Sequence, residues 1–186
     1  ARRAAPVSWC KAMLPVFITL GSNFSPEHNL PRAAGLLNDQ LGVERASHVY
    51  ESAPLGPEGE PLDQPPFLNA AVLCWVRKDV PLDVLKFRVL RAIEAGMGRM
   101  RRADKYAPRP IDLDIVLYGD AVIDDPARGI RLPDPEIITR AHVALPLADL
   151  DPGYIHPETG ETLAQIAARF AGMPGIRRIG LRLVER

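Results

Sequence analysis

Residues 99–118, RMRRADKYAPRPIDLDIVLY, carry the strand pattern from which the fold can be inferred. Within residues 111–117 (IDLDIVL) the side chains should alternate between the two faces of a β-strand, with Asp112 and Asp114 on one face. The other face then carries the apolar side chains Ile111, Leu113, Ile115 and Leu117. The Cα atoms of the two aspartates would lie about 6.5–7 Å apart, close enough for both carboxylates to bind one divalent ion or a pair of ions.

Basic residues precede these aspartates and acidic residues follow them. Five of the eleven residues from 99 to 109 are basic, and five of the fourteen from 112 to 125 are aspartates. Guanidinium groups bind phosphate oxygens in pairs, while carboxylates hold the divalent cations that bridge those oxygens. With no His or Cys nearby, the pattern predicts a polyphosphate site with Mg²⁺ rather than zinc. The alternative is a solvated basic loop beside an ordinary strand, which the depletion of aspartate in strands disfavours.

Hydrophobic periodicity over the rest of the chain predicts short strands and helices. The expected strands cover residues 16–21, 43–51, 67–76, 111–118 and 176–184, and a hairpin joins 121–124 to 129–132. The expected helices cover residues 30–41, with Pro31 in the first turn, 81–97 and 162–171. The order β-α-β-β-α-β predicts an α+β, ferredoxin-like fold with a mostly antiparallel sheet and helices packed on its faces.

Length and composition restrict the class of protein. The 186 residues suit one domain, expected over residues 15–186 after a flexible tail at 1–14. The 23 basic and 23 acidic residues cancel, so no overall field favours nucleic acid or a membrane surface, and no apolar run has transmembrane length. The two cysteines form no CxxC pair, so a reducing, cytoplasmic location is expected.

The sequence lacks the common nucleotide-binding signatures. GxxxxGK[ST] does not occur, and Gly96-Met97-Gly98 ends an expected helix instead of opening one. Residues 109–116, RPIDLDIV, after Ala107-Pro108, instead resemble the signature of the 6-hydroxymethyl-7,8-dihydropterin pyrophosphokinase family of folate biosynthesis. The resemblance continues, in the family's order, through the segments 20–23 (LGSN), 52–57 (SAPLGP), 67–72 (FLNAAV) and 145–147 (LPL).

This resemblance implies transfer of the β,γ-pyrophosphoryl group of ATP to the pterin's hydroxymethyl group, with release of AMP. It implies two Mg²⁺ ions held by Asp112 and Asp114, which act in catalysis with Arg99 and Arg101. The implied ATP-binding residues are Glu94, Arg101, Tyr106, Arg109, Ile115 and Arg140. The implied pterin-binding residues are Ser52, Ala53, Leu55, Phe67, Asn69 and His142. The implied partners are these small molecules alone, bound by a monomer.

The chain departs from the family's pattern at three places. His142 stands where a second pterin-stacking aromatic is common, so stacking there should be weaker and pH-sensitive. Asp134 stands where a histidine is frequent near the nucleotide, and the loop 56–66 is long and rich in proline. None of these departures involves the paired aspartates. Replacing either aspartate by alanine is expected to abolish turnover without destabilising the strand.

Two other classes of protein fit some of these residues. A two-metal phosphohydrolase or nuclease would use the paired aspartates, but it would need no pocket at Phe67–Asn69 and would release free phosphate. An RNA-binding module would use the basic run, but it should carry aromatic side chains on its sheet and a basic stripe. An aromatic content of 6% and a net charge of zero disfavour the RNA-binding class.

Overall fold

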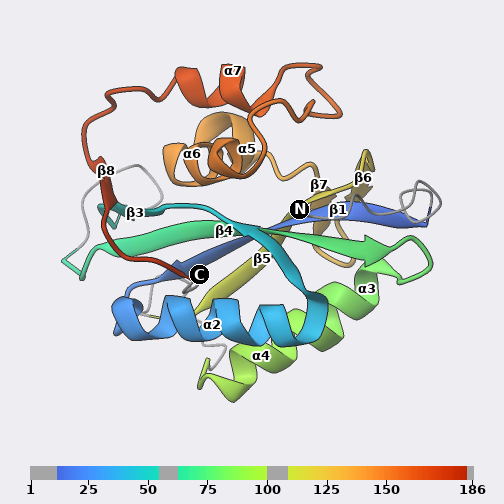
Figure 1. The fold of residues 1–186 in the computed structure, drawn as a ribbon, viewed down its shortest axis with the longest axis horizontal. Helices are drawn as coiled ribbons and strands as arrows, with labels where there is room; N and C mark the ends of the chain where they lie inside the picture. The colour runs from blue at the N-terminus through green and yellow to red at the C-terminus, as the bar shows by residue number, and fades with distance from the viewer. Residues whose placement is uncertain (1–11, 55–62, 100–108, 184–186) are drawn as a thin grey trace, which may run out of the picture.

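The computed structural model describes residues 12–54, 63–99 and 109–183. Its main sheet has six strands, paired antiparallel in the order β5-β1-β4-β3-β8 with β2 also on β4 (Figure 1). The strands are β1 (Met13–Ser22), β2 (Val43–Ala46), β3 (Val49–Ser52), β4 (Phe67–Arg77), β5 (Asp112–Tyr118) and β8 (Ile176–Ile179). The α+β fold with an antiparallel sheet is therefore confirmed. β1 begins two residues before the expected domain start at position 15, and residues 1–11 lie outside the described ranges.

Helices cover both faces of this sheet (Figure 1). One face carries α2 (Pro26–Leu41) and a continuous helix made of α3 (Leu82–Val84), the π-helical turn η1 (Leu85–Leu90) and α4 (Arg91–Gly96). The other face carries α5 (Glu136–Thr139), α6 (Ala141–Leu150) and α7 (Leu163–Ala168). Alternate residues of β1 serve the two cores: Ile18 is buried towards α2, and Phe17 is buried towards α6.

Two helical expectations need correction. α2 begins at Pro26 rather than at position 30, so Pro31 lies inside the helix and not in its first turn. An interior proline costs a backbone hydrogen bond, but Leu30, Ala33 and neighbouring side chains are fully buried against the sheet and stabilise the helix. α5 and α6 were not expected. α6 is apolar around most of its circumference and contains Pro146, so residues 141–150 show no clear amphipathic period.

Several observed element boundaries also differ from the boundaries that the periodicity predicts. The strand expected over 43–51 is divided into β2 and β3, because Ser47 turns inward and its Oγ accepts a hydrogen bond from the Ala71 backbone N–H at 2.8 Å. β8 ends at Ile179 rather than at 184. The expected hairpin is confirmed as β6 (Ile123–Asp125) paired with β7 (Ile130–Leu132).

A β-bulge changes the expected faces of β5. The register between β1 and β5 shifts between Phe17 and Ile18, which face Leu117 and Ile115 respectively. A bulge adds one unpaired residue and reverses the alternation beyond it. Leu117 is therefore buried with Phe17 on the α6 face, whereas Leu113 and Ile115 are buried on the α2 face. The prediction that Leu117 shares a face with Leu113 and Ile115 is wrong.

The strand register places one row of residues across four strands. Asp112 of β5 faces Gly21 of β1, Gly21 faces Asn69 of β4, and Asn69 faces Tyr50 of β3. Residues directly opposite one another in an antiparallel sheet project from the same face. Asp112 and Asn69 therefore share a face, about 10 Å apart across two strand spacings, with only a glycine between them.

Candidate active site

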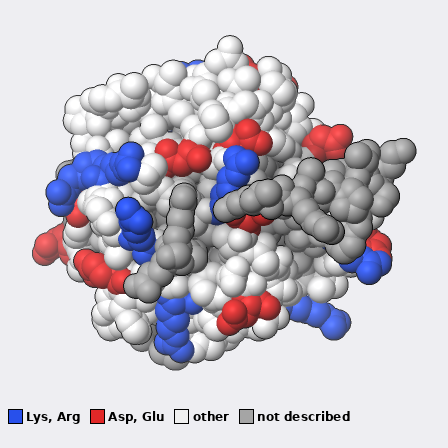
Figure 2. Space-filling model, in the orientation of Figure 1, with Lys and Arg blue, Asp and Glu red and all other residues white. Residues whose placement is uncertain are grey.

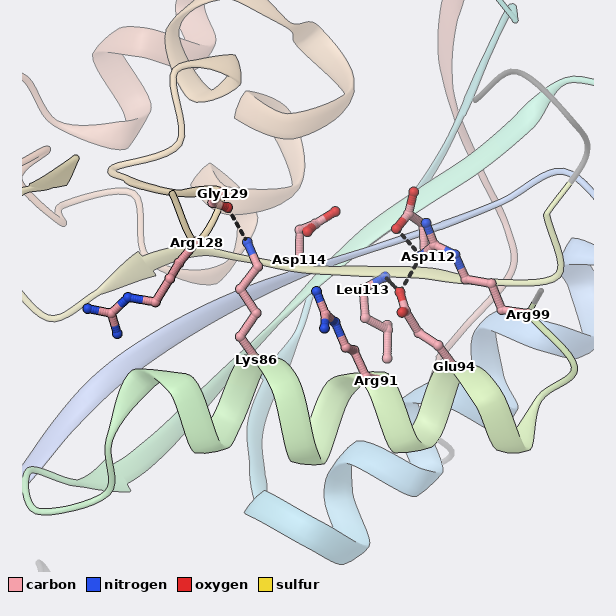
Figure 3. Close-up of a pocket in the computed structure, with 9 residues that line it drawn as sticks. All are labelled: Lys86, Arg91, Glu94, Arg99, Asp112, Leu113, Asp114, Arg128 and Gly129. Atoms are coloured by element: carbon pink, nitrogen blue, oxygen red, sulfur yellow. Dashed lines mark hydrogen bonds and ion pairs between the residues drawn. The ribbon is translucent and has the colours of Figure 1, made fainter. Parts of the chain in front are cut away.

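The two aspartates of β5 project from the edge of the sheet as the alternation predicts. Asp112 and Asp114 point away from α4, while Leu113 between them points into the core on the α4 side (Figure 3). β5 is an edge strand, paired only with β1 in the main sheet of the described residues. The carboxylates are thus accessible from the side of the sheet as well as from its face.

Asp112 is neutralised by two arginines that precede the strand. Arg99 donates hydrogen bonds to Asp112 and to Glu94, and Arg109 donates to the other oxygen of Asp112. Glu94 is 4% exposed, and its Oε1 also accepts a hydrogen bond from the Leu113 backbone N–H at 2.9 Å. Because a buried carboxylate needs such partners, Glu94 fixes both Arg99 and the first residues of β5. The geometry makes Glu94 a positioning group in this structure.

The electrostatic state of the two aspartates differs. Burial within the pocket raises the pKa of Asp114 to about 6, and the charge of Asp112 adds to this effect, while Lys86 opposes it. The Asp114 side chain still meets solvent, so its desolvation comes from the protein atoms around the carboxylate rather than from full occlusion. For Arg99, burial acts to lower the pKa, but the charges of Asp112, Glu94 and Asp114 outweigh it and raise that pKa.

Two residues of the LGSN segment, which sequence reasoning left without a role, hold the approach to β5. The Asn23 side-chain carbonyl accepts a hydrogen bond from the Arg109 backbone N–H at 2.9 Å, and Ser22 Oγ donates to the Pro110 carbonyl at 2.6 Å. The Asn23 amide also donates to Gln64 at 3.3 Å. Both residues are at most 2% exposed. They therefore fix the backbone of Arg109 beside Asp112 and connect it to the segment that enters β4.

The expected pterin residues of β3 and β4 lie on the same face as the aspartates. Asn69 is 8% exposed and donates to Ser52 Oγ at 2.9 Å and to the Tyr50 carbonyl at 3.4 Å. Phe67 faces Ser52 across the strand pair and lies two residues before Asn69, on the same face. A Cβ atom on Gly21 would lie 3.5 Å from Asn69 Oδ1, so glycine leaves space beside this amide.

The other predicted site residues have different positions. The side chain of Ile115 is 4% exposed in the core on the opposite face, so a nucleotide could meet only its backbone at the free edge of β5. Arg140 is the exposed residue between α5 and α6, and Ala53 is exposed after β3. Leu55, Arg101 and Tyr106 lie outside the described residues.

His142 lies in the first turn of α6. Burial lowers its pKa to about 4, and the charge of Arg140 adds to this effect. Its Nε2 lies 3.9 Å from a Glu136 carboxylate oxygen. The imidazole is therefore neutral near pH 7, and any pH-sensitive stacking by His142 would appear well below neutral pH.

A pocket of about 310 Å³ opens beside β5 (Figure 3). Besides Glu94, Arg99, Asp112 and Asp114, it is lined by residues that sequence reasoning missed: Lys86, Arg91, Leu113, Arg128 and Gly129. Lys86 and Arg91 come from the continuous helix, and Arg128 and Gly129 come from the turn between β6 and β7. The only early signal was the positive charge of Lys86, Arg91 and Arg128 on two expected elements.

The carboxylates suit a divalent cation that a substrate helps to hold. Within the described ranges, no group of three or more His, Cys, Asp or Glu side chains forms a complete metal cage. Mg²⁺ is commonly bound by one or two carboxylates together with substrate phosphates and water. Asp114 has no ion-pair partner among the described residues, so its oxygens remain available for such a cation. The donor set therefore fits Mg²⁺ delivered with a polyphosphate.

Surface charge and helix character bear on the other classes of partner. On the face shown in Figure 2, basic and acidic side chains of the described residues are interspersed, which differs from the basic stripe of a nucleic-acid-binding surface. None of the helices in the described ranges combines the length and apolar character that crossing a bilayer requires.

Paired carboxylates on an edge strand, arginine side chains beside them and an amide in the same cross-strand row fit a phosphoryl-transfer site of the class that uses a nucleotide and a second small substrate. The model of the 7,8-dihydro-6-hydroxymethylpterin-pyrophosphokinase (HPPK) family matches residues 17–152, and the chain belongs to this family. The 2-amino-4-hydroxy-6-hydroxymethyldihydropteridine pyrophosphokinase of Pseudomonas aeruginosa is 36% identical over 167 residues, 88% of this chain and 96% of that protein. That of Synechocystis is 36% identical over 152 residues, 80% of this chain and 72% of that protein.

Longer relatives contain the same region as one part. The folate synthesis bifunctional protein of Arabidopsis thaliana is 40% identical over 138 residues, which are 73% of this chain but 26% of that protein. The solved Plasmodium falciparum HPPK-DHPS structure with pterin and p-hydroxybenzoate matches 90% of this chain and 46% of its own, with a TM-score of 0.65. At 17% identity, this structural match supports the fold alone.

Proposed function

We propose that this enzyme transfers the β,γ-pyrophosphoryl group of MgATP to the hydroxymethyl group of 6-hydroxymethyl-7,8-dihydropterin and releases AMP. The observation that carries the proposal is the row Asp112–Gly21–Asn69, which lies on one face of the sheet. An amide that recognises a flat heterocycle thus stands about two strand spacings from a carboxylate suited to a phosphate-bound cation. Such side-by-side binding brings the pterin's hydroxymethyl oxygen towards the β-phosphorus.

Asp112 and Asp114 would hold two Mg²⁺ ions in this proposal. When bound, the ions would neutralise phosphate charge and orient the triphosphate for in-line attack. In the present structure Arg99 and Arg109 neutralise Asp112. If the Asp112 carboxylate binds a metal cation instead of these arginines, the two guanidinium groups become available to the phosphate oxygens. There they would stabilise developing negative charge. By resemblance, Arg101 would act with them.

The nucleotide and the pterin would occupy neighbouring parts of this face. Arg109, Arg140, Arg101 and Tyr106 would bind ATP through their side chains, and Ile115 through its backbone; Glu94 would act through Arg99. For the pterin, Asn69 would bind the polar edge of the ring and Phe67 would stack on it. Ser52, Ala53, Leu55 and the neutral His142 would complete that pocket. These roles follow the family resemblance, and the common face of Ser52, Phe67 and Asn69 with the aspartates supports them.

We further propose that residues 15–186 act as a single domain, as a cytoplasmic monomer with small molecules as its only partners. The aspartates, the arginines paired with Asp112 and Asn69 come from one chain, which supports this proposal. Analytical ultracentrifugation of the active enzyme tests this: one monomeric species would support it, and a dimer that alone forms AMP would contradict it.

The decisive assay for the proposed function measures AMP by chromatography after MgATP is added with and without the hydroxymethyldihydropterin. We expect AMP only when the pterin is present, in equal amount to the pyrophosphorylated pterin. Release of free phosphate from MgATP without the pterin would instead indicate a two-metal phosphohydrolase and would contradict the proposal.

A further inference from the structure

Lys86 is a pocket residue that neither the family resemblance nor the sequence pattern indicated. Its side chain extends from η1 across one end of the pocket, and its Nζ donates a hydrogen bond to the Gly129 carbonyl at 3.1 Å (Figure 3). Arg99 lies at the other end of the pocket, and the two aspartates lie between these cations in the view of Figure 3. The pocket therefore has a positive group at each end of its carboxylate pair.

The π-helical turn explains why Lys86 reaches this pocket. In an α-helix, residues three and four apart share a face, whereas a π-helix bonds residues five apart and brings those residues into line. Lys86 and Arg91 are five residues apart across η1, and both line the pocket together with Glu94 of α4. The wider turn thus adds the lysine to the face that already carries Glu94. Such single π-turns occur often at functional sites.

Carboxylates lie near Lys86, so a phosphate that binds in this part of the pocket needs a cation beside them. Lys86 lies close enough to Asp114 and to Asp134 to lower the pKa of each carboxyl, against the larger effect of burial. Asp134 stands where a histidine is frequent in the family, so an acidic side chain replaces one that can carry positive charge. Lys86 therefore offsets the negative charge of Asp114, which lines the pocket, and of Asp134 nearby, when a phosphate approaches.

We propose that Lys86 is a nucleotide-binding residue whose ammonium group contacts the phosphate chain from the end of the pocket opposite Arg99. The inference rests on the proposed function for the identity of the ligand, a nucleoside triphosphate. The bond to Gly129 uses one of three ammonium donors, so the others remain able to meet a phosphate oxygen. The lysine of the helix thus supplies a positive charge near the position where Asp134 replaces the family's frequent histidine.

A purely structural role for Lys86 makes a different prediction. Arg128 also ties the β6–β7 turn to the helix: it donates to Asp83 of α3, and to Asp125 of its own hairpin, each at 2.7 Å. These pairs are exposed and individually weak, but they leave the turn connected when the bond from Lys86 to Gly129 is lost. Removal of the lysine charge should therefore change ligand affinity more than it changes the fold.

The experiment compares Lys86→Gln and Lys86→Arg with the wild type by titration calorimetry, using Mg²⁺ and an ATP analogue with an α,β-methylene bridge. Arg88→Gln is the matched control, because Arg88 is exposed on the same π-helical turn and does not line the pocket. We expect Lys86→Gln to raise the analogue's Kd about tenfold, roughly 1.4 kcal/mol, and Lys86→Arg to recover most of the affinity. Pterin affinity, thermal unfolding and the Arg88→Gln variant should match the wild type.

Three results would overturn the role of Lys86: unchanged nucleotide affinity in Lys86→Gln, equal losses for nucleotide and pterin, or a loss in Arg88→Gln as large as that in Lys86→Gln. The proposed function has a separate readout in AMP formation by the wild type. A wild type that binds the analogue but forms no AMP would contradict the proposed reaction, while the affinity comparison would still decide the role of Lys86.

Discussion

Asp112 and Asp114 stand two residues apart on the same face of β5, yet their surroundings differ. Asp112 is paired with Arg99 and Arg109, whereas Asp114 has no ion-pair partner among the described residues. The protein atoms around the Asp114 carboxylate desolvate it and raise its pKa, and the charge of Asp112 adds to this effect. Strand alternation therefore sets the direction of both carboxylates, while the preceding residues decide which one is neutralised.

This difference assigns the two aspartates different parts in stability. Asp112 belongs to a network in which one arginine connects it to the buried Glu94. Asp114 is exposed to solvent beside the negative charge of Asp112 and gains no compensating pair within the described residues. We therefore expect the fold to depend on Asp112 and to tolerate the loss of Asp114, although catalysis should need both.

The largest expected effect is on turnover in Asp112→Ala and Asp114→Ala. Each should lower kcat by far more than tenfold, because each removes one ligand for the phosphate-bound cations. Their stabilities should separate: Asp112→Ala should lose about 1–3 kcal/mol of unfolding free energy, while Asp114→Ala should lose none. Urea unfolding and steady-state kinetics check both. This differs from the expectation that neither substitution would destabilise the strand, because Asp112 is paired with Arg99 and Arg109.

Arg99→Ala should have the next largest effect, and it tests the pairing that distinguishes Asp112 from Asp114. It leaves Arg109 as the ion-pair partner of Asp112 and removes the guanidinium group that pairs with the buried Glu94. The free energy of unfolding should therefore fall by about 3 kcal/mol. The single-turnover rate should fall about tenfold or more, with only a few-fold change in the Kd of MgATP. Quench-flow kinetics test this. A defect confined to nucleotide affinity would mean that Arg99 is only a ground-state phosphate ligand.

Asn69→Ala tests the far end of the cross-strand row. It should cost about 1–3 kcal/mol in pterin binding, because it leaves polar groups of the ring without a partner. MgATP affinity should change little, since the aspartates are about two strand spacings away. Fluorescence or calorimetric titration with each ligand separates the two. Equal losses for both ligands would show that Asn69, through Ser52 and Tyr50, supports the fold instead.

The smallest effect concerns pH. Because the folded pKa of Asp114, about 6, lies above its unfolded value, the folded state holds the proton more tightly. The stability due to Asp114 is present below about pH 4 and is lost as pH rises through 6. Wild type should therefore lose stability relative to Asp114→Asn over this range in urea unfolding. Parallel pH profiles for the two proteins would contradict the raised pKa.

Local patterns in the sequence were sufficient for much of the fold. The antiparallel sheet, the β6–β7 hairpin and the common face of Asp112 and Asp114 follow from alternation, which depends on neighbours in sequence. α6 escaped detection because a helix buried on most sides has no amphipathic period. The sequence pattern also did not predict the face of Leu117, because a bulge is set by pairing with β1 and leaves no local signal.

The site was predictable only in part for the same reason. Strand alternation supplied Asp112 and the family resemblance supplied Asn69, but their common row depends on the register of three strands. The network of Glu94, Arg99 and Asp112 joins a helix end to a strand, and neither periodicity nor composition specifies such contacts. The position of Lys86 at the pocket depends on the π-helical turn, which no propensity scale indicates.

The most direct test of the shared face measures how near the cation site lies to Asn69. Mn²⁺ with the α,β-methylene ATP analogue would be added to ¹⁵N-labelled enzyme, and the side-chain amide signals of Asn69 and Asn38 would be followed. Asn38 of α2, on the other face of the sheet, is the internal control. We expect strong paramagnetic broadening of the Asn69 amide and a sharp Asn38 signal. Bound Mn²⁺ with a sharp Asn69 signal would contradict the claim that carboxylates and pterin pocket share one face.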